Sequence, residues 1–250
     1  MTINEVGIMH LQVAERPITI GEMVVADYRK AAIFRKFELD YCCGGKRSLE
    51  EACQKKGLDA QLVQLELDAV ITSREETSHD YGEWTLDALA AYIVAHHHLY
   101  VVESLPMLYE LTAKVARVHG ERHPELVKIH QIFNAVAAEL DAHMRKEEHM
   151  LFPYITRMAI AQASGSSMPA QIFGSVKHPI QMMESEHVSA GDGMANIRFL
   201  SRQYTPPADA CTSYRVLYAK LQEFERDLHQ HVHLENNILF PKAIAMEESK

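Results

Sequence analysis

The sequence lacks the marks of several protein classes. No apolar run is long enough to span a bilayer and no signal-peptide pattern opens the chain, so we expect a cytoplasmic protein without membrane contact. Only four of its 250 residues are cysteines, and they form no paired framework, which agrees with a reducing compartment. Basic residues are in the minority, with 25 Lys and Arg against 34 Asp and Glu, and the net charge of -9 argues against a nucleic-acid partner.

The chain does contain enough apolar sequence for a large core, because 47% of its residues are hydrophobic. Helical patterns after Trp84 occupy about two thirds of the chain and predict an all-α fold, with an up-down four-helix bundle over residues 84–248. Short helices are expected in a small N-terminal domain over residues 17–71, and the polar stretch 72–83 is the expected linker. Residues 1–16 fit neither part and are interpreted as a loosely held extension.

One phrase of eleven residues occurs twice, as HMRKEEHMLFP at residues 143–153 and as HVHLENNILFP at residues 231–241. Both copies read His-x-x-x-Glu and then Leu-Phe-Pro. Residues four apart lie one above the other on a helix, so each copy presents an imidazole and a carboxylate to a single point. Two such helices can supply paired carboxylates that bridge two metal ions, with histidines as terminal ligands.

The apolar periodicity of these segments tests whether the histidines and glutamates point inward. Apolar residues recur at alternating steps of four and three, which is the rhythm of the buried face of a bundle helix. Three stripes follow it and include the candidate ligands: Ile129, Ile132, Val136, Leu140, His143, Glu147 and Met150; Val176, Ile180, Met183, His187, Ala190, Met194 and Ile197; Leu217, Leu221, Phe224, Leu228, His231, Glu235 and Ile238. A buried glutamate needs a partner such as a metal ion, because an unpaired one destabilises the fold by several kcal/mol.

A fourth helix, expected over residues 86–118, carries the run His96, His97 and His98. Its apolar positions spread over an arc that accepts either His97 or His98, so periodicity does not choose between them. In an up-down bundle, two residues at the same height on successive helices lie equally far along the chain from the loop that joins those helices. Counting residues in this way places the candidate ligands at one height. The midpoints between successive candidates fall in turn-like stretches, namely after Gly120, in SGSSMP and near Pro207.

The chemistry of these residues favours a pair of metal ions. The alternative without a metal is a helical bundle with a few hydrogen-bonded histidines in its core. It explains poorly why six polar residues lie at one height. A single zinc site uses three or four ligands and would leave buried carboxylates over. Four imidazoles and two carboxylates suit iron or manganese, and their order differs from the Glu-x-x-His of ferritin-like di-iron bundles. Glu139, one turn before His143, either accepts a hydrogen bond from a ligand N–H or faces solvent.

The other histidines do not share this placement. His119 lies beside a loop, far along the helix from the cluster, and is not expected to be a ligand. His149, His229 and His233 are turned away from the stripes and are expected to be solvated or to support the ligands from outside. The remaining histidines have no partner at ligand spacing: His10, His79, His123, His130 and His178.

At these residues the chain resembles hemerythrin-like proteins and, within them, the iron-sulfur cluster repair di-iron family (repair of iron centres, ScdA and YtfE type). The segment FRKFELDYCCGG, at residues 34–45, is similar to the hallmark of the small domain that this family has before its bundle. MESEH, which ends at His187, and HLENNILFP are also similar to family segments. The resemblance extends over roughly residues 17–246.

The resemblance implies a hemerythrin-like bundle that holds two iron ions per chain in an oxo- or hydroxo-bridged di-iron centre. His98 is preferred to His97 because the family histidine precedes Leu-Pro at the distance that His98 keeps from Leu105 and Pro106. The implied metal ligands are His98, His143, Glu147, His187, His231 and Glu235.

The four cysteines fall into two kinds. Cys42 and Cys43 are adjacent, so a disulfide between them would be strained, and the glycines that follow allow close approach of a ligand or another backbone. A catalytic thiol role and a purely structural turn are both open for this pair. Cys53 and Cys211 are expected to be ordinary buried thiols.

Three functions are compatible with the resemblance and with the chemistry of such a site. The first is repair of iron-sulfur clusters damaged by nitrosative or oxidative stress, with the di-iron centre donating iron. The second is an enzyme that reduces nitric oxide or a related small oxidant, and the third is a protein that binds or senses oxygen or nitric oxide. The expected partners are damaged iron-sulfur proteins and these two small ligands, and a homodimer is compatible with the sequence. Whether the chain is an enzyme depends on which function holds.

Overall fold

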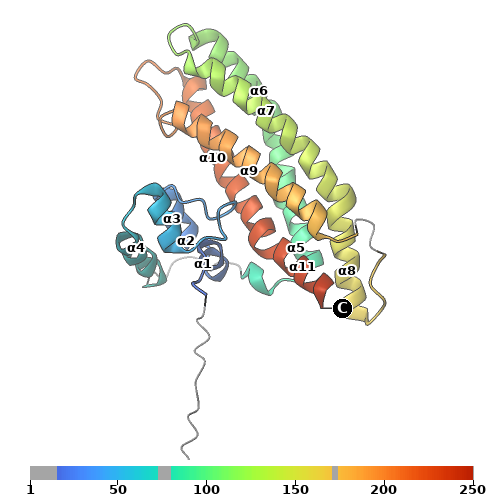
Figure 1. Ribbon diagram of the computed structural model, residues 1–250. Coiled ribbons are helices and arrows are strands. Elements are labelled where there is room, and N and C mark those ends of the chain that lie inside the picture. Colours follow the sequence, from blue (N-terminus) through green and yellow to red (C-terminus); the bar gives the residue numbers. More distant parts are fainter. Residues whose placement is uncertain (1–15, 73–79, 171–173, 250) are drawn as a thin grey trace, which may run out of the picture.

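The computed structural model describes residues 16–72, 80–170 and 174–249, and within these ranges it contains helices and no strand beyond one isolated bridge. The predicted all-α class is confirmed. Figure 1 shows a group of short helices lying against the side of a long helical bundle. The short helices are α1 (Ile20–Ala26), α2 (Lys30–Lys36), α3 (Leu49–Lys56) and α4 (Ala60–Thr72). None of the described helices is long and apolar enough to cross a membrane.

Four rods form the bundle, and three of them contain one π-helical turn. The first rod is α5 (Leu86–Ile93), the π turn Val94–His98 and α6 (Leu99–His119). The second is α7 (Glu125–Lys146), the π turn Glu147–Leu151 and α8 (Phe152–Ser164). The third is α9 (Lys177–Leu200), and the fourth is α10 (Thr212–Leu234), the π turn Glu235–Leu239 and α11 (Phe240–Glu248). The rods run up and down (Figure 1) and are joined by loops where the sequence predicted turns.

The π turns shift the face that the following residues present, because each adds one residue to a helical turn. Met150, which periodicity places on the buried stripe, is 51% exposed, and Leu151 is buried in its place. The prediction for Met150 is wrong because a regular 3.6-residue repeat does not allow for the inserted residue. In the second copy of the repeated phrase, Ile238 and Leu239 are both buried.

Two apolar clusters fill the bundle. One lies among α6, α7, α9 and α10 and includes Phe133, Leu221 and Phe224. The other lies among α5, α8, α11 and the first part of α9 and includes Leu89 and Phe240. The π turns lie between these two sets of helices, so the bundle is interrupted there by a layer of polar side chains.

The short helices of the small domain depend on their caps. Thr19 and Glu22 form a capping box at the start of α1, and Ser48 and Glu51 form another at the start of α3. Gly57 ends α3 in the left-handed conformation, with φ of 67°, which glycine adopts without a steric penalty. Helices of seven or eight residues are marginal in isolation, so these caps and the packing around them hold the domain together.

The predicted N-terminal extension and linker are described only in part. Residues 1–15 of the extension and residues 73–79 of the linker lie outside the described residues. The end of the linker, Tyr81–Glu83, forms a 3₁₀ turn whose tyrosine is buried against Trp84. Lys242 of α11 donates to the Trp84 carbonyl at 3.0 Å, so this end of the predicted linker is an ordered part of the bundle.

The small domain is fastened to the bundle through Asn237, in the π turn before α11. Its side-chain amide donates to the carbonyls of Tyr41 and Cys42, at 3.2 and 3.4 Å. Gly45 packs so closely that a β-carbon there would lie 2.7 Å from Asn237 Oδ1. The loop that carries the adjacent cysteines therefore rests directly on the fourth rod.

Two glycines of α9 give a matched test of how tightly the rods pack. A β-carbon on Gly193 would lie 2.4 Å from Val136 Cγ2 of α7, whereas one on Gly191 would meet Cys43 Sγ at an ordinary 3.7 Å. We expect Gly193→Ala to destabilise the fold by about 1–3 kcal/mol through overpacking. Gly191→Ala should stabilise it by about 0.5–1 kcal/mol, because alanine favours a helix interior. Urea unfolding followed by circular dichroism measures both, and equal stabilities would contradict the packing described here.

Candidate metal centre

Six polar side chains meet in the layer between the two apolar clusters. They come from all four rods and are at most 2% exposed: His98, His143, Glu147, His187, His231 and Glu235. His98 closes the first π turn, and Glu147 and Glu235 open the other two. Since π turns are frequent at functional sites, the backbone itself marks this layer. The structure thus brings together the six residues predicted from the sequence as ligands.

The ligand atoms form two groups that share both carboxylates. Each group contains Glu147 and Glu235, together with His98 and His231 or with His143 and His187, and its ligand atoms lie within 4.8 Å of one another. Glu235 Oε1 lies 2.9 Å from His231 Nε2, and its Oε2 lies 3.0 Å from His187 Nε2. Glu147 Oε2 lies 3.2 Å from His143 Nε2 and 3.4 Å from His98 Nε2. Two metal ions bridged by two carboxylates, each with two histidines, would fit this arrangement.

The Nδ1 atoms, which face away from the centre of the layer, show which ring nitrogen of each histidine carries a proton. His98 Nδ1 lies 2.8 Å from Glu148 Oε1, and His143 Nδ1 lies 2.9 Å from Glu186 Oε2. Carboxylate oxygens only accept, so each Nδ1 carries a proton and donates it. The lone pair of each Nε2 is then directed at the centre of the layer, as in a metal-ligating histidine.

The inner nitrogens face one another at short distances. His187 Nδ1 donates to the side-chain oxygen of Asn236 at 2.8 Å, so its Nε2 also points inward. This Nε2 lies 2.9 Å from His143 Nε2, and the Nε2 atoms of His98 and His231 are 3.2 Å apart. Lone pairs at these distances repel unless a proton or a metal ion lies between them.

The carboxylates show the same need for a cation. Both oxygens of Glu147 and Oε2 of Glu235 are buried without a hydrogen bond among the described residues. Burial opposes the charged form of His98 and His143, yet contacts with these carboxylates raise the pKa of His98 to about 10 and that of His143 to about 9. Protons on these histidines therefore balance the two carboxylates, and metal ions that bind here compete with them. This donor set fits a pair of metal ions.

His97 is also buried but is turned elsewhere. Its Nδ1 donates to Asp227 at 2.9 Å, and its ring stacks on that of His231 with centroids 5.7 Å apart and planes 5° apart. His98, the next residue, reaches the carboxylates. The π turn places both successive histidines in the interior, which explains why apolar periodicity accepts either one.

The two copies of the repeated phrase occupy matching places. Phe152, from the first Leu-Phe-Pro, stacks on His98, and Phe240, from the second, stacks on His187. The residue that follows the shared glutamate accepts a hydrogen bond from the histidine on which the phenylalanine stacks. In the first copy the Glu148 carboxylate accepts from His98, and in the second the Asn236 amide oxygen accepts from His187. The two helix pairs are therefore related by an approximate twofold arrangement around the site.

The twofold relation fails at one position. Glu186 of α9 orients His143, whereas its counterpart in the first rod is His97, which binds Asp227 instead. His231 Nδ1 is left without a hydrogen-bond partner among the described residues. Loss of such a partner typically weakens metal binding about 10–100-fold. The group that contains His231 is therefore the less firmly supported of the two.

Sequence reasoning missed Glu186 and considered Glu139 instead. Glu139 is exposed and accepts a hydrogen bond from Ser189 at 3.0 Å, so of its two predicted alternatives the structure shows the solvent-facing one. Glu186 reaches His143 from another helix, next to His187 in the sequence. Its spacing from His143 along the chain carries no signal, because the contact depends on how α7 and α9 pack.

The prediction that His233 is solvated is wrong, whereas His229, which has the same prediction, is half-buried. His233 is 1% exposed and lies edge-on to Tyr41 of the small domain, with ring centroids 5.6 Å apart. His229 faces the same tyrosine at 6.2 Å. Burial lowers the pKa of His233 to about 3 and that of His229 to about 4, so both rings are neutral. They belong to the surface on which the small domain rests; His149, by contrast, is exposed.

The cysteines lie outside the cluster of six. Cys42 and Cys43 are free thiols, and a cavity of about 260 Å³ is lined by both of them and by Asn236 and Asn237. Cys53 is buried as predicted, but the prediction for Cys211 is wrong, because it is exposed at the position just before α10.

Comparison with known proteins finds two family matches and a group of relatives. Residues 17–71 match ScdA_N, described as a domain of unknown function (DUF542), and residues 89–243 match the hemerythrin HHE cation binding domain. The chain is 37% identical over 229 residues to the iron-sulfur cluster repair protein YtfE of Yersinia pestis (strain Pestoides F), which covers 92% of this chain and 97% of the relative. The protein of the same name from Yersinia pseudotuberculosis serotype O:1b (strain IP 31758) has the same identity and coverage.

The unequal support of the two groups predicts two steps of metal binding. The metal-free chain, titrated anaerobically with Fe(II), should show dissociation constants that differ about 10–100-fold. Glu186→Gln should weaken the tighter binding step, because a neutral amide polarises His143 less than a carboxylate does. The two dissociation constants should then lie closer together. Glu139→Gln is the matched control and should leave both steps unchanged. Two equal steps in the unaltered chain would show that the missing partner of His231 has no effect.

Proposed function

This chain belongs to the family of iron-sulfur cluster repair proteins with a hemerythrin domain, and on that premise we propose that it repairs damaged iron-sulfur clusters by donating iron from its buried site. The damage is the kind that nitric oxide or oxidants cause. The observation that carries the proposal is the pair of ligand groups that share Glu147 and Glu235. Such a site would hold two iron ions, and iron is what a damaged cluster has lost.

The donor set supports iron over zinc. Each group offers imidazole nitrogens and carboxylate oxygens and no thiolate, which suits iron. A lone zinc ion in one group would use at most four ligands and leave the two buried histidines of the other group without a metal ion. Bound iron would supply two ions that change between the ferrous and ferric states.

The aromatic side chains around the site would shield it from water, and bound iron would be held there until it is reduced. Phe152 and Phe240 are 4% and 0% exposed and cover His98 and His187. Interactions between carboxylates and cations are stronger in such a dry environment than in water. Reduction lowers the positive charge of the iron and so weakens its attraction to the shared carboxylates.

The group that contains His98 and His231 is the proposed point of release. Among the described residues His231 has no acceptor at Nδ1, so its imidazole would be a weaker ligand than the other three. Contacts with Glu147 and Glu235 hold the pKa of His98 at about 10 against the effect of burial, so His98 would carry a proton whenever this group is empty. This proton replaces part of the lost positive charge and stabilises the emptied group.

Transfer of isotopically labelled iron tests the proposal. Reduced protein loaded with labelled iron is mixed with an iron-sulfur dehydratase whose cluster has been damaged by nitric oxide. We expect the dehydratase to regain activity while the label, followed by Mössbauer spectroscopy, moves into its cluster. If activity returns while all of the label stays on the protein, iron donation is wrong.

A pair of variants separates the site from the rest of the chain. Glu147→Gln combined with Glu235→Gln removes the shared charges and should lower the repair rate about tenfold or more. Glu139→Gln, which leaves the site intact, should repair like the unaltered protein. Nitric oxide consumption with an electron donor is measured in the same samples. Steady consumption without transfer of label would favour a reductase, and a stable, reversible oxygen adduct would favour a binding protein.

A further inference from the structure

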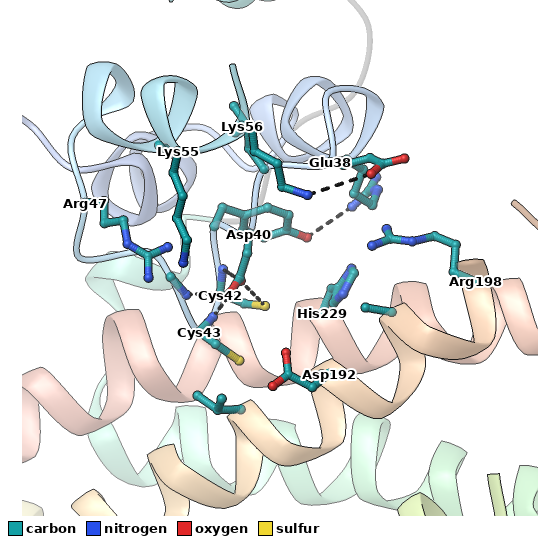
Figure 2. A pocket seen from close by; sticks show the side chains of 18 residues that line it. Glu38, Asp40, Cys42, Cys43, Arg47, Lys55, Lys56, Asp192, Arg198 and His229 are labelled. Atoms are coloured by element: carbon teal, nitrogen blue, oxygen red, sulfur yellow. Dashed lines mark hydrogen bonds and ion pairs between the residues drawn. The ribbon is translucent and has the colours of Figure 1, made fainter. Parts of the chain in front are cut away.

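A second cavity, of about 500 Å³, lies between the small domain and the helices α9 and α10. Figure 2 shows it from close by, with the cysteine loop and the side chains of Arg47 and Lys55 on one side and Asp192, Arg198 and His229 on the other. Sites for small molecules in proteins span about 300–1,000 Å³. The volume is therefore that of a site for a small organic molecule.

The lining of this cavity is basic in a chain that is acidic as a whole. Five basic residues stand against three acidic ones, namely Arg35, Arg47, Lys55, Lys56 and Arg198 against Glu38, Asp40 and Asp192. Among the described residues, Arg47 and Lys55 have no ion pair with a carboxylate, while Lys56 lies 3.8 Å from Glu38. Arg47 is half-buried and Lys55 is exposed at the edge of the cavity, so both can meet a ligand from solvent, and their positive charge favours an anionic one.

Asp40 forms no ion pair with Arg47 or Lys55 among the described residues, and its oxygens accept hydrogen bonds from the loop that carries it. Its Oδ1 accepts from the backbone N–H groups of Cys42 and Cys43 at 3.1 and 2.9 Å, and its Oδ2 accepts from that of Gly44 at 2.8 Å. The same contacts argue against a metal ion between Asp40 and the two sulfurs. The carboxylate shapes the loop and leaves the cavity to the thiols and the cations.

The two thiols are not equivalent. Cys42 is buried, and its S–H donates to Asp40 Oδ1 at 3.2 Å; contact with Cys43 and burial raise the pKa of Cys42 further. Cys43 is half-buried and lines the cavity opposite Gly191, where a β-carbon would lie 3.7 Å from Cys43 Sγ. Cys43 is therefore the thiol that a ligand can reach.

We propose that this cavity binds a small thiol or disulfide that carries carboxylates, with its sulfur at Cys43 and its carboxylates at Arg47 and Lys55. When a disulfide binds, the Cys43 thiolate attacks one of its sulfur atoms. A sulfur–sulfur bond forms to Cys43 and the bond within the ligand breaks, so Cys43 is oxidised while half of the ligand is reduced. The leaving thiolate takes up the proton that Cys43 gave to water. A second molecule of the thiol reverses the step.

Phosphate esters would also be attracted by the basic lining, but they make no use of the sulfur. The thiol and the two unpaired cations together select a ligand that has both an anion and a sulfur atom. This activity is independent of the metal site and does not require the repair function.

The experiment compares disulfides of different charge on the full-length protein. Oxidised glutathione is anionic, hydroxyethyl disulfide is neutral and cystamine is cationic. Peptide mapping by mass spectrometry follows adducts at Cys43 and at Cys211, which is exposed elsewhere and serves as an internal reference. Relative to Cys211, we expect Cys43 to react about tenfold faster or more with oxidised glutathione than with the neutral disulfide, and slowest with cystamine. Equal relative rates for the three disulfides would overturn the proposal.

A matched pair of double variants identifies the cations. Arg47→Gln with Lys55→Gln should lower the rate with oxidised glutathione to that of hydroxyethyl disulfide, while the neutral disulfide still modifies Cys43 at its original rate. That second rate shows that the fold and the thiol are intact. Lys114→Gln with Lys128→Gln, which makes the same change in net charge on exposed positions outside the cavity, should leave all rates unchanged. Loss of the preference in this control instead, or adducts at Cys42 in place of Cys43, would overturn the assignment.

Discussion

Two buried carboxylates set the conditions for the rest of the structure. Glu147 and Glu235 are both 0% exposed, and an uncompensated buried charge destabilises a protein by several kcal/mol. Among the described residues, the ion pairs of these carboxylates are made with histidines, and no lysine or arginine takes part. Imidazoles that donate outward through Nδ1 can compensate only by holding a further proton or by sharing a metal ion. The middle of the bundle is therefore stable in one of these two states, which couples its packing to its contents.

The π turns are the backbone feature that makes this layer possible. Successive residues of a regular helix differ by about 100° in direction, so a regular helix rarely turns two neighbours toward one layer, although the long side chain of Glu186 reaches it beside His187 in α9. In the π turn Glu147–Leu151, Glu147 lies between the two ligand groups while Glu148 reaches His98. Glu235 and Asn236 divide the same two tasks in the last π turn. In the second and fourth rods, neighbouring residues of the π turn thus supply both a shared ligand and the group that orients a histidine.

The architecture and the six residues were predictable because they depend on local regularities. Apolar spacing, the repeated phrase and the loop midpoints all reflect single helices or their lengths, and the structure shows four rods whose candidate side chains meet at one level. The π turns were not predictable, since a repeat of 3.6 residues has no term for an inserted residue; hence Met150 is exposed and His97 is buried beside His98. The roles of Glu186 and His233 were not predicted for another reason. Each role depends on a contact with another helix or with the small domain, which the sequence of a single helix does not reveal.

Neighbouring amides in the last π turn connect the two parts of the chain. Asn236 accepts from the Nδ1 of His187, while Asn237 donates to the carbonyls of Tyr41 and Cys42. Because these two asparagines are successive residues of one turn, the contact of the cysteine loop and the contact that orients His187 are made by neighbouring residues. His187 belongs to the more firmly supported ligand group, and His231 has no comparable connection. The small domain therefore rests beside the ligand group of His143 and His187, whereas the missing hydrogen bond lies in the group of His98 and His231.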